Sequence, residues 1–315
     1  MKLWHNIKIN QDRYFLRDGL YIMKLIDVLR SGECSLSFEV FPPKTDTAFE
    51  SVQAAAEAIA RLRPAFVSVT YGAGGGTSSY TLDIAKKIKE NNGVATLAHL
   101  TCVSSTKETV RQKLEEIRAA GIENVMALRG DLTPELEASD RGAWEYHHAI
   151  ELVREIKETC PGLCVGGACY PEVHPDSSNQ KQDIAFLKEK VDAGCEFLTT
   201  QMFFENNLLY NFLYKIREAG ITVPVVAGIM PITNANQVER AIRLSGSFMP
   251  QRFKSLVDKF GSNPDAMKQA GIAYATDQII DLYANNVTNV HIYTMNKPDI
   301  AAKIQENLSK ILGAV

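Results

Sequence analysis

The sequence predicts an α/β protein folded as a single (β/α)8 TIM barrel with extra helices. Eight short runs rich in β-branched residues alternate with longer segments of helical periodicity along the 315 residues, as expected for parallel strands joined by crossover helices. No Gly/Ser-rich linker divides the chain into two halves. One barrel of roughly 250 residues with additions fits this length better than two doubly wound units.

The chain begins with a segment that we expect to lie outside the barrel. Residues 1–22 are polar and aromatic, and they lack the continuous apolar stretch of a secretory signal. Met23 opens an amphipathic pattern that ends at Arg30, so either methionine can serve as the start. We therefore expect an N-terminal extension and leading helix over residues 1–30, followed by a catalytic barrel over residues 31–315.

The predicted strands follow this extension in order. They are Ser35–Val40, Phe66–Thr70, Thr96–Thr101, Asn124–Leu128, Leu163–Tyr170, Glu196–Met202, Pro224–Ile229 and Asn289–Thr294. Helical periodicity between them is clearest at Thr47–Arg61, Thr106–Ala119 and Asp183–Ala193. The interval before the last strand is the longest, and Pro250 and Pro264 mark the boundaries of an insertion or extra helix.

Charge and composition exclude several classes of protein. A formal net charge of -3 supplies no basic field for a nucleic-acid backbone, and no stretch of eighteen apolar residues could span a bilayer. The six cysteines include no CxxC pair, and the spacing of Cys160, Cys164 and Cys169 fits no common zinc pattern. We expect reduced thiols, a cytoplasmic protein and no metal site.

One carboxylate lies within an apolar strand. Glu39 stands in the run SLSFEVFPPK, between Phe38 and Val40. A carboxyl that loses hydration among such residues has a raised pKa, which suits proton donation. The alternative is an acid exposed on an edge strand.

Polar residues end six consecutive predicted strands. In a parallel barrel these ends open into one shared mouth. Taken singly, His99 could be a core histidine bonded to a backbone carbonyl, and Gln201 an interior hydrogen-bonding group. Their coincidence predicts a functional site. The strand ends are Glu39, Thr70-Tyr71-Gly72, His99, Arg129-Gly130-Asp131, Tyr170 and Gln201.

Two further patterns have structural interpretations. The glycine run from Tyr71 to Thr77 (YGAGGGT) lacks the GK[ST] ending of a phosphate loop and the GxGxxG dinucleotide pattern, so we interpret it as a mobile loop over the barrel mouth. His147 and His148 lie in a segment of helical pattern from Trp144 to Thr159. We interpret them as a pair on a helix surface.

The chain resembles the bacterial FAD-dependent methylenetetrahydrofolate reductases, which are flavoproteins built on a (β/α)8 barrel. Seven runs look like family motifs in the family's order, and together they cover about residues 35 to 300. These runs are SFEVFPP (37–43), FVSVTYG (66–72), AHLTC (98–102), ALRGDL (127–132), YPEVHP (170–175), KVDAG (190–194) and TQMFF (200–204).

The resemblance implies an oxidoreductase with FAD as cofactor that reduces 5,10-methylenetetrahydrofolate to 5-methyltetrahydrofolate with NAD(P)H, NADH being favoured. This reaction is ping-pong, because the nicotinamide reduces the flavin and leaves before the folate binds. The resemblance also implies one-carbon metabolism, methionine biosynthesis and a homo-oligomer. The folate ring must open to an iminium cation, which requires a proton on its bridging nitrogen. Glu39 aligns with the family's general acid.

Other aligned residues surround the reacting groups. Asp131 aligns with a flavin-adjacent carboxylate, whose charge disfavours anionic reduced flavin and favours a cationic iminium; it could instead be a turn or N-cap residue. Gln201 matches a glutamine that hydrogen-bonds the pterin, since an amide both donates and accepts. Tyr293 and Lys297 align with substrate-side positions. Lys297 stands where arginine is common, which keeps the charge but loses the bidentate fork.

The same matching implies a set of flavin-binding positions, with cationic groups at the pyrophosphate and Asp183 at a ribose hydroxyl. The segment from Thr133 to Trp144 differs from the family in length and composition. The set comprises Thr70, His99, Leu128, Arg129, Gly130, Asp131, Tyr146, Tyr170, His174, Asp183 and Lys190.

The electron donor leaves alternatives open. Ala241 falls where several family members carry an aromatic residue that packs on nicotinamide or folate, so a partner subunit could deliver electrons to the flavin instead of NADH. A flavin-free pterin-binding methyl-transfer barrel would share the pterin contacts without needing Asp131. A catalytically silent subunit should show disruption at Glu39, Asp131 or Gln201, and this sequence retains all three.

Overall fold

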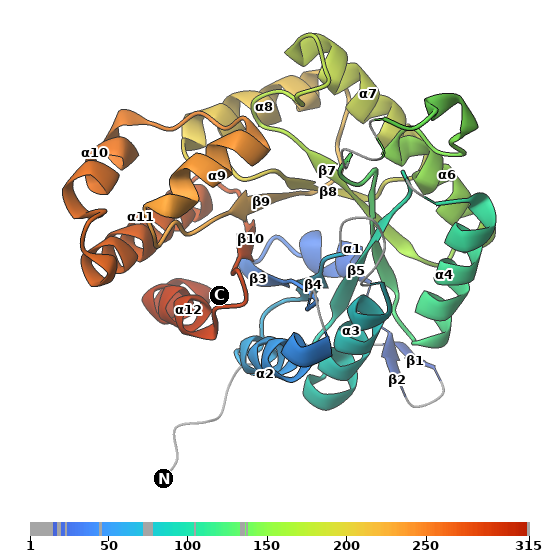
Figure 1. Cartoon of the computed structure of the whole chain (residues 1–315), viewed down its shortest axis with the longest axis horizontal. Helices are drawn as coiled ribbons and strands as arrows, with labels where there is room; N and C mark the ends of the chain where they lie inside the picture. Colours follow the sequence, from blue (N-terminus) through green and yellow to red (C-terminus); the bar gives the residue numbers. More distant parts are fainter. Residues whose placement is uncertain are drawn as a thin grey trace.

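The computed structural model describes residues 15–17, 20–22, 24–43, 46–71, 78–103, 105–132, 136 and 138–313. Its centre is a closed barrel of parallel strands in the order β10-β3-β4-β5-β6-β7-β8-β9 (Figure 1). The predicted (β/α)8 barrel is therefore confirmed. The strands are β3 (Ser35–Val40), β4 (Val67–Val69), β5 (Thr96–Thr101), β6 (Asn124–Leu128), β7 (Cys164–Cys169), β8 (Phe197–Thr200), β9 (Val225–Ile229) and β10 (Asn289–Tyr293).

Helices surround this barrel (Figure 1). The predicted Thr47–Arg61 helix is confirmed as a 3-10 turn followed by α2, and Thr106 caps α4 by accepting a hydrogen bond from the Thr109 amide. The helix predicted from Asp183 begins three residues earlier, because Asn179 accepts a hydrogen bond from Gln182 N and caps α7. The helices that follow strands are α2 (Phe49–Ala60), α3 (Ser78–Asn92), α4 (Lys107–Ala119), α6 (Ala149–Thr159), α7 (Gln180–Asp192), α8 (Asn206–Glu218) and α12 (Pro298–Leu312).

The long interval before β10 contains additional helices, as predicted. These are α9 (Asn236–Ser245), α10 (Gln251–Phe260) and α11 (Pro264–Ala284), drawn in orange and red-orange beside the barrel in Figure 1. Pro250 is the N-cap of α10, and Pro264 is the first residue of α11, a position where the missing N–H costs nothing. Phe204 from the β8 loop and Phe253 of α10 stack in a separate small core.

The N-terminal segment has more structure than expected. Two short antiparallel strands, β1 (Phe15–Arg17) and β2 (Leu20–Ile22), precede α1 (Leu25–Leu29), which confirms the leading helix. Met23 lies outside the described residues. The α1 side chains are buried against inward-facing barrel residues such as Phe66, so this helix closes the barrel at the N-terminal ends of its strands.

Side chains alternate between the two faces of each barrel strand. On β3, Phe38 and Val40 pack in the core shared with the surrounding helices, which leaves Ser37 and Glu39 on the inward face. The upper interior of the barrel is therefore polar. None of the described helices combines the length and the apolar character needed to cross a membrane.

Candidate active site

Glu39 is buried inside the barrel near the C-terminal end of β3. Glu39 is 7% exposed. In the strand register its Cα lies opposite those of Ser68 on β4 and Tyr293 on β10. Burial raises the pKa of its carboxyl to about 8. The structure thus excludes the alternative of an exposed edge-strand acid. The cause of burial differs from the predicted one, because the adjacent Phe38 and Val40 face the helices.

Two histidines lie in the same interior. His99 on β5 places Nε2 3.9 Å from Glu39 Oε2, and burial lowers its pKa to about 4. His291 on β10 is 2% exposed, and burial lowers its pKa to about 3. Both rings are therefore neutral at pH 7, so neither offers Glu39 a cation.

Sequence reasoning missed His291 and its serine partners. Its Nδ1 lies 2.7 Å from Ser37 Oγ, and its Nε2 lies 2.9 Å from Ser68 Oγ. The period-2 alternation of strands could have found them, since His291 precedes Tyr293 by two residues and Ser37 precedes Glu39 by two.

Tyr293 and Gln201 lie at the ends of β10 and β8. The Tyr293 hydroxyl donates to Thr200 O at 2.5 Å, and Gln201 Oε1 accepts from Met202 N at 2.8 Å. The amide NH2 of Gln201 can still donate to a ligand. Gly228 is required beside them, because a Cβ there would lie 2.4 Å from both the Tyr293 hydroxyl and Thr200 O.

The end of β10 is joined to the end of β3. Asn296 accepts from Phe41 N at 2.8 Å and donates to Phe41 O at 2.9 Å, while Thr294 Oγ1 donates to Glu39 O at 2.6 Å. Lys297 follows directly, with Nζ 3.5 Å from Thr233 Oγ1. These bonds fix the backbone of Glu39 relative to Tyr293 and Lys297.

The end of β6 carries the Arg129-Gly130-Asp131 sequence. Gly130 has φ +96°, and a Cβ there would lie 3.1 Å from Thr101 Cβ, so both conformation and space require glycine. Arg129 Nη1 pairs with Asp176 Oδ2 at 2.5 Å. Asp131 is exposed.

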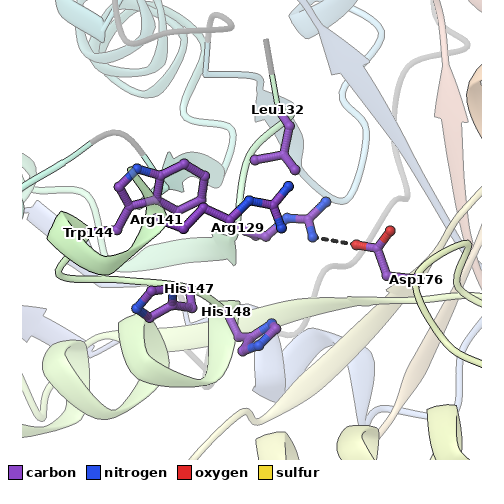
Figure 2. A pocket seen from close by; sticks show the side chains of 7 residues that line it. All are labelled: Arg129, Leu132, Arg141, Trp144, His147, His148 and Asp176. Carbon is purple, nitrogen blue, oxygen red and sulfur yellow. Dashed lines mark hydrogen bonds and ion pairs between the residues drawn. The ribbon is translucent and has the colours of Figure 1, made fainter. Parts of the chain in front are cut away.

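A cavity of about 410 Å³ opens beside Arg129 (Figure 2). The Arg141 guanidinium lies 5.6 Å from the Trp144 ring centroid, and the Trp144 and His147 rings stack with centroids 6.2 Å apart. The cavity combines positive charge with an aromatic face. Its lining residues are Arg129, Leu132, Arg141, Trp144, His147, His148 and Asp176.

The interpretation of His147 and His148 as a helix-surface pair is wrong. Helix α6 begins at Ala149, after both residues. The Glu151 carboxylate accepts from His147 N at 2.5 Å and from His148 N at 3.0 Å, which caps the helix and stops it there. Both imidazoles consequently line the cavity (Figure 2).

The loop after β7 brings other predicted residues together near Arg129. Tyr170 meets His174 edge to face with centroids 4.5 Å apart, and His174 Nδ1 accepts from Asp176 N at 3.0 Å. Asp183, in the first turn of α7, accepts from His174 N at 3.1 Å. Asp183 therefore shapes the loop that carries Asp176.

Other predicted flavin-binding residues do not line the cavity. Tyr146 is 1% exposed, and its hydroxyl has no hydrogen-bond partner in the part of the chain that the structure describes. Lys190 donates from α7 to Ala168 O at 2.5 Å. Leu128 packs against the inner cluster, and Thr70 is half-buried at the end of β4. The glycine run at residues 72–77 lies outside the described residues.

Comparison with known proteins identifies the family. The family model described as methylenetetrahydrofolate reductase matches residues 24–309. The chain is 32% identical over 282 residues to the 5,10-methylenetetrahydrofolate reductase of Escherichia coli K12, covering 88% of this chain and 91% of that protein. The corresponding enzyme of Pectobacterium carotovorum is 33% identical over 277 residues, with the same coverage.

Plant and structural relatives extend the comparison. Methylenetetrahydrofolate reductase (NADH) 1 of Arabidopsis thaliana is 34% identical over 92% of this chain, which spans about half (51%) of that protein's length. A Clostridium thermocellum protein described as binding two copies of 5-methyl-5,6,7,8-tetrahydrofolic acid superposes with a TM-score of 0.68 over 92% of this chain and 99% of its own, at 13% identity, which shows the shared fold. By its family match and its bacterial relatives, the chain belongs to the methylenetetrahydrofolate reductase family.

Proposed function

We propose that this chain reduces 5,10-methylenetetrahydrofolate to 5-methyltetrahydrofolate with NAD(P)H, NADH being favoured, in a ping-pong reaction through FAD. Membership of the family makes the chain an oxidoreductase. The barrel of residues 31–315 would be the catalytic domain. The observation that carries the proposal is Glu39, a buried acid with a pKa of about 8 inside the barrel mouth.

Glu39 would act as the general acid. With a pKa of about 8, its carboxyl is roughly nine-tenths protonated at pH 7. It can therefore deliver a proton to the bridging nitrogen of the folate, which opens the five-membered ring. The neutral His99 and His291 keep this proton on Glu39, because a nearby cation would favour the carboxylate.

The cavity beside Arg129 fits the adenosine diphosphate half of FAD. Its two guanidinium groups and two imidazoles suit a pyrophosphate, and Trp144 offers a face for a purine. Arg129 and Arg141 would bind the phosphates. When bound, FAD would carry the hydride from the nicotinamide to the folate.

The remaining predicted flavin contacts are part of this proposal. Tyr170 and His174 in the loop after β7 meet each other close to Arg129, and Asp183 at the start of α7 accepts a hydrogen bond from His174 N. Gly130, with φ +96°, forms the turn that joins Arg129 to Asp131. The other predicted contacts are Thr70, His99, Leu128, Tyr146, Asp131 and Lys190.

The substrate side would involve Gln201, Tyr293 and Lys297. The amide NH2 of Gln201 can donate to the pterin ring, and Lys297 supplies positive charge at the end of β10. The exposed Asp131 carboxylate would favour a cationic iminium at the same mouth.

One observation favours a second route for the electrons. Ala241 is 2% exposed within the small core of the inserted helices, so it presents no surface to a ligand. A partner subunit that delivers electrons to the flavin therefore remains the alternative donor. We also propose that the protein is cytoplasmic, in line with its six free cysteines. We propose further that it forms a homo-oligomer.

An anaerobic absorbance spectrum tests the proposal. The purified protein should show a yellow flavin band that NADH bleaches and methylenetetrahydrofolate restores. If NADH leaves the band unchanged but the folate reoxidises the chemically reduced flavin, the electron donor would be a partner protein and not NADH. A colourless protein that fails to take up FAD would refute the cofactor and leave the flavin-free pterin-binding barrel.

A further inference from the structure

The chain turns sharply where β10 ends, directly beside Glu39. Lys297 N donates to Thr294 O at 3.1 Å, which closes a four-residue turn. The two central residues, Met295 and Asn296, have φ of +54° and +55°. Positive φ at both central positions is typical of a type I′ turn, where glycine and asparagine are usual and methionine is costly. Such a backbone persists only where surrounding contacts hold it.

The Asn296 side chain supplies contacts of this kind. Its Oδ1 accepts from Phe41 N at 2.8 Å, and its Nδ2 donates to Phe41 O at 2.9 Å. Only one orientation of the amide satisfies both bonds, because a backbone N–H can only donate and a carbonyl oxygen can only accept. The side chain therefore binds the backbone of Phe41 as a neighbouring strand would.

This clamp lies where the regular pairing of β3 with β10 stops. The ladder between the two strands ends at the Tyr293–Glu39 pair. Two prolines follow Phe41, and a proline has no N–H to offer a neighbouring strand. Asn296 thus extends the attachment of β3 to the end of β10 beyond Glu39.

The turn is also joined to Glu39 directly. The Thr294 hydroxyl donates to Glu39 O at 2.6 Å and accepts from Asn296 N at 3.2 Å. Lys297 ends the turn and is the N-cap residue of α12, with Nζ 3.5 Å from Thr233 Oγ1. Movement of Asn296 would therefore displace Glu39 and Lys297 relative to each other.

We propose that Asn296 is a positioning residue: its amide clamp on Phe41 holds the turn after β10 closed and thereby places Glu39 and Lys297 for reduction of the folate. The inference rests on the proposed function, in which Glu39 donates a proton and Lys297 lies on the substrate side. Placement matters because a general acid must lie within hydrogen-bond reach of its target, and a shift of about 1 Å can cost about 10²-fold in rate.

Strand β4 holds β3 from its other side. Val40 pairs with Val69, and Thr70 N donates to Val40 O at 3.0 Å. These bonds should keep the barrel folded when the clamp is lost. Loss of the Asn296 amide should therefore change the placement of Glu39 more than the stability of the protein.

Asn296→Gly gives the first test, because glycine adopts positive φ freely and the change removes only the amide. In single turnovers, reoxidation of the reduced flavin by methylenetetrahydrofolate should slow by about 10- to 100-fold. Reduction of the flavin by NADH should stay within about twofold, because this step needs no proton from Glu39. Reoxidation at the unmutated rate would overturn the proposal, and equal slowing of both steps would indicate a general structural effect and contradict it.

Asn286→Gly is the matched control. Asn286 has φ +62° in the turn before β10, at the opposite end of the same strand. The same substitution at the same kind of backbone position should leave both rates within about twofold. A loss of folate reduction like that of Asn296→Gly would contradict the specific role of the clamp.

The second test needs no turnover and measures the pKa of Glu39 by carbon-13 NMR, with Glu39→Gln for assignment. Opening of the end of β3 would hydrate the carboxyl, so its pKa should fall by about one unit in Asn296→Gly, a tenfold loss of proton affinity. His99 and Tyr293, the titratable groups that face Glu39 from β5 and β10, are the same in both proteins. An unchanged pKa would overturn the proposal.

Thr294→Val provides a second variant of nearly unchanged shape. It removes the hydroxyl that joins Asn296 N to Glu39 O, so folate reduction and the pKa of Glu39 should both fall, as in Asn296→Gly. Unmutated values for both would contradict the link from the turn to Glu39. Absence of folate reduction in the unmutated protein would refute the proposed function, while the NMR measurement would still show whether Asn296 places Glu39.

Discussion

Arg129 and Asp176 form an ion pair at the edge of the cavity beside the barrel mouth, with Nη1 and Oδ2 2.5 Å apart (Figure 2). The Arg129 guanidinium holds the pKa of the Asp176 carboxyl below its usual range. A pyrophosphate bound by Arg129 would have to compete with this carboxylate. The pair thus sets the affinity of the cavity for an anion.

Asp176→Asn should therefore strengthen FAD binding. The change removes a negative charge and a competitor for Arg129, and an exposed pair of this kind is worth up to about 1 kcal/mol, or roughly two- to fivefold in affinity. Titration of the apoprotein with FAD, followed by flavin fluorescence, measures the effect. Asp192→Asn in α7 is the control, because Asp192 pairs with Lys188 on the exposed helix surface. Weaker FAD binding by Asp176→Asn would contradict the assignment.

Trp144→Leu should weaken binding of FAD but not of FMN. The indole would stack on the adenine, and loss of one base–aromatic stack costs about 1–3 kcal/mol, which corresponds to roughly five- to hundredfold in affinity. FMN has no adenosine and would not contact Trp144. Trp144→Phe should restore most of the affinity. Equal losses of affinity for FAD and FMN would show that the adenine does not bind at Trp144.

Glu39→Gln should separate the two half-reactions. Reduction of the flavin by NADH needs no proton from Glu39 and should stay within about twofold, whereas reduction of the folate should fall by at least 10²-fold. Stopped-flow absorbance measures each step alone. Equal loss of both steps in a correctly folded variant would refute the assignment of Glu39 as general acid.

The raised pKa of Glu39 also predicts how stability depends on pH. Its pKa of about 8 in the folded protein exceeds the unfolded value of 4.5, so its contribution is complete below pH 4.5 and is lost as pH rises toward 8. Between pH 5.5 and 7.5 this loss amounts to about 2–3 kcal/mol. Glu39→Gln lacks the titrating group. In urea unfolding, the free energy of unfolding of the variant should therefore rise by about 2–3 kcal/mol relative to that of the unmutated protein between pH 5.5 and 7.5. A difference between the two proteins that stays constant with pH would show that Glu39 does not have a raised pKa in the folded protein.

Much of the fold follows from local pattern. Runs such as Ser35–Val40 and Asn124–Leu128 have the bounds that the sequence predicts, because apolar residues occupy the helix-facing side of both strands and are buried there. The β1–β2 hairpin was missed because its strands are only three residues long. The start of α7 was missed because Asn179, a capping residue, lies upstream of the apolar periodicity.

The site was predictable where it lies at strand ends. Glu39 and His99 were found because they lie near the C-terminal ends of β3 and β5, one and two residues before the last. Ser37 and His291 lie one inward position deeper than Glu39 and Tyr293, where the sequence gives no distinct signal. The role of His147 was misjudged because the Glu151 cap sits inside the helical pattern, and only the structure shows where the helix begins. The hydrogen bonds of His291 with Ser37 and Ser68 join residues far apart in the chain, so the spacing of residues along the sequence could not predict them.

Gly228→Ala should disturb the folate side of the mouth without affecting the flavin side. The new Cβ would lie 2.4 Å from the Tyr293 hydroxyl and from Thr200 O, so Tyr293 would have to move away from its backbone partner. Such overpacking costs about 1–3 kcal/mol of stability. We expect a several-fold higher KM for the folate with unchanged FAD affinity, measured by steady-state kinetics and FAD titration. Tyr293→Phe combined with Gly228→Ala should recover part of the stability, because removing the hydroxyl relieves one of the two contacts at 2.4 Å. Failure to recover any stability would place the strain on Thr200 O and the ring of residue 293.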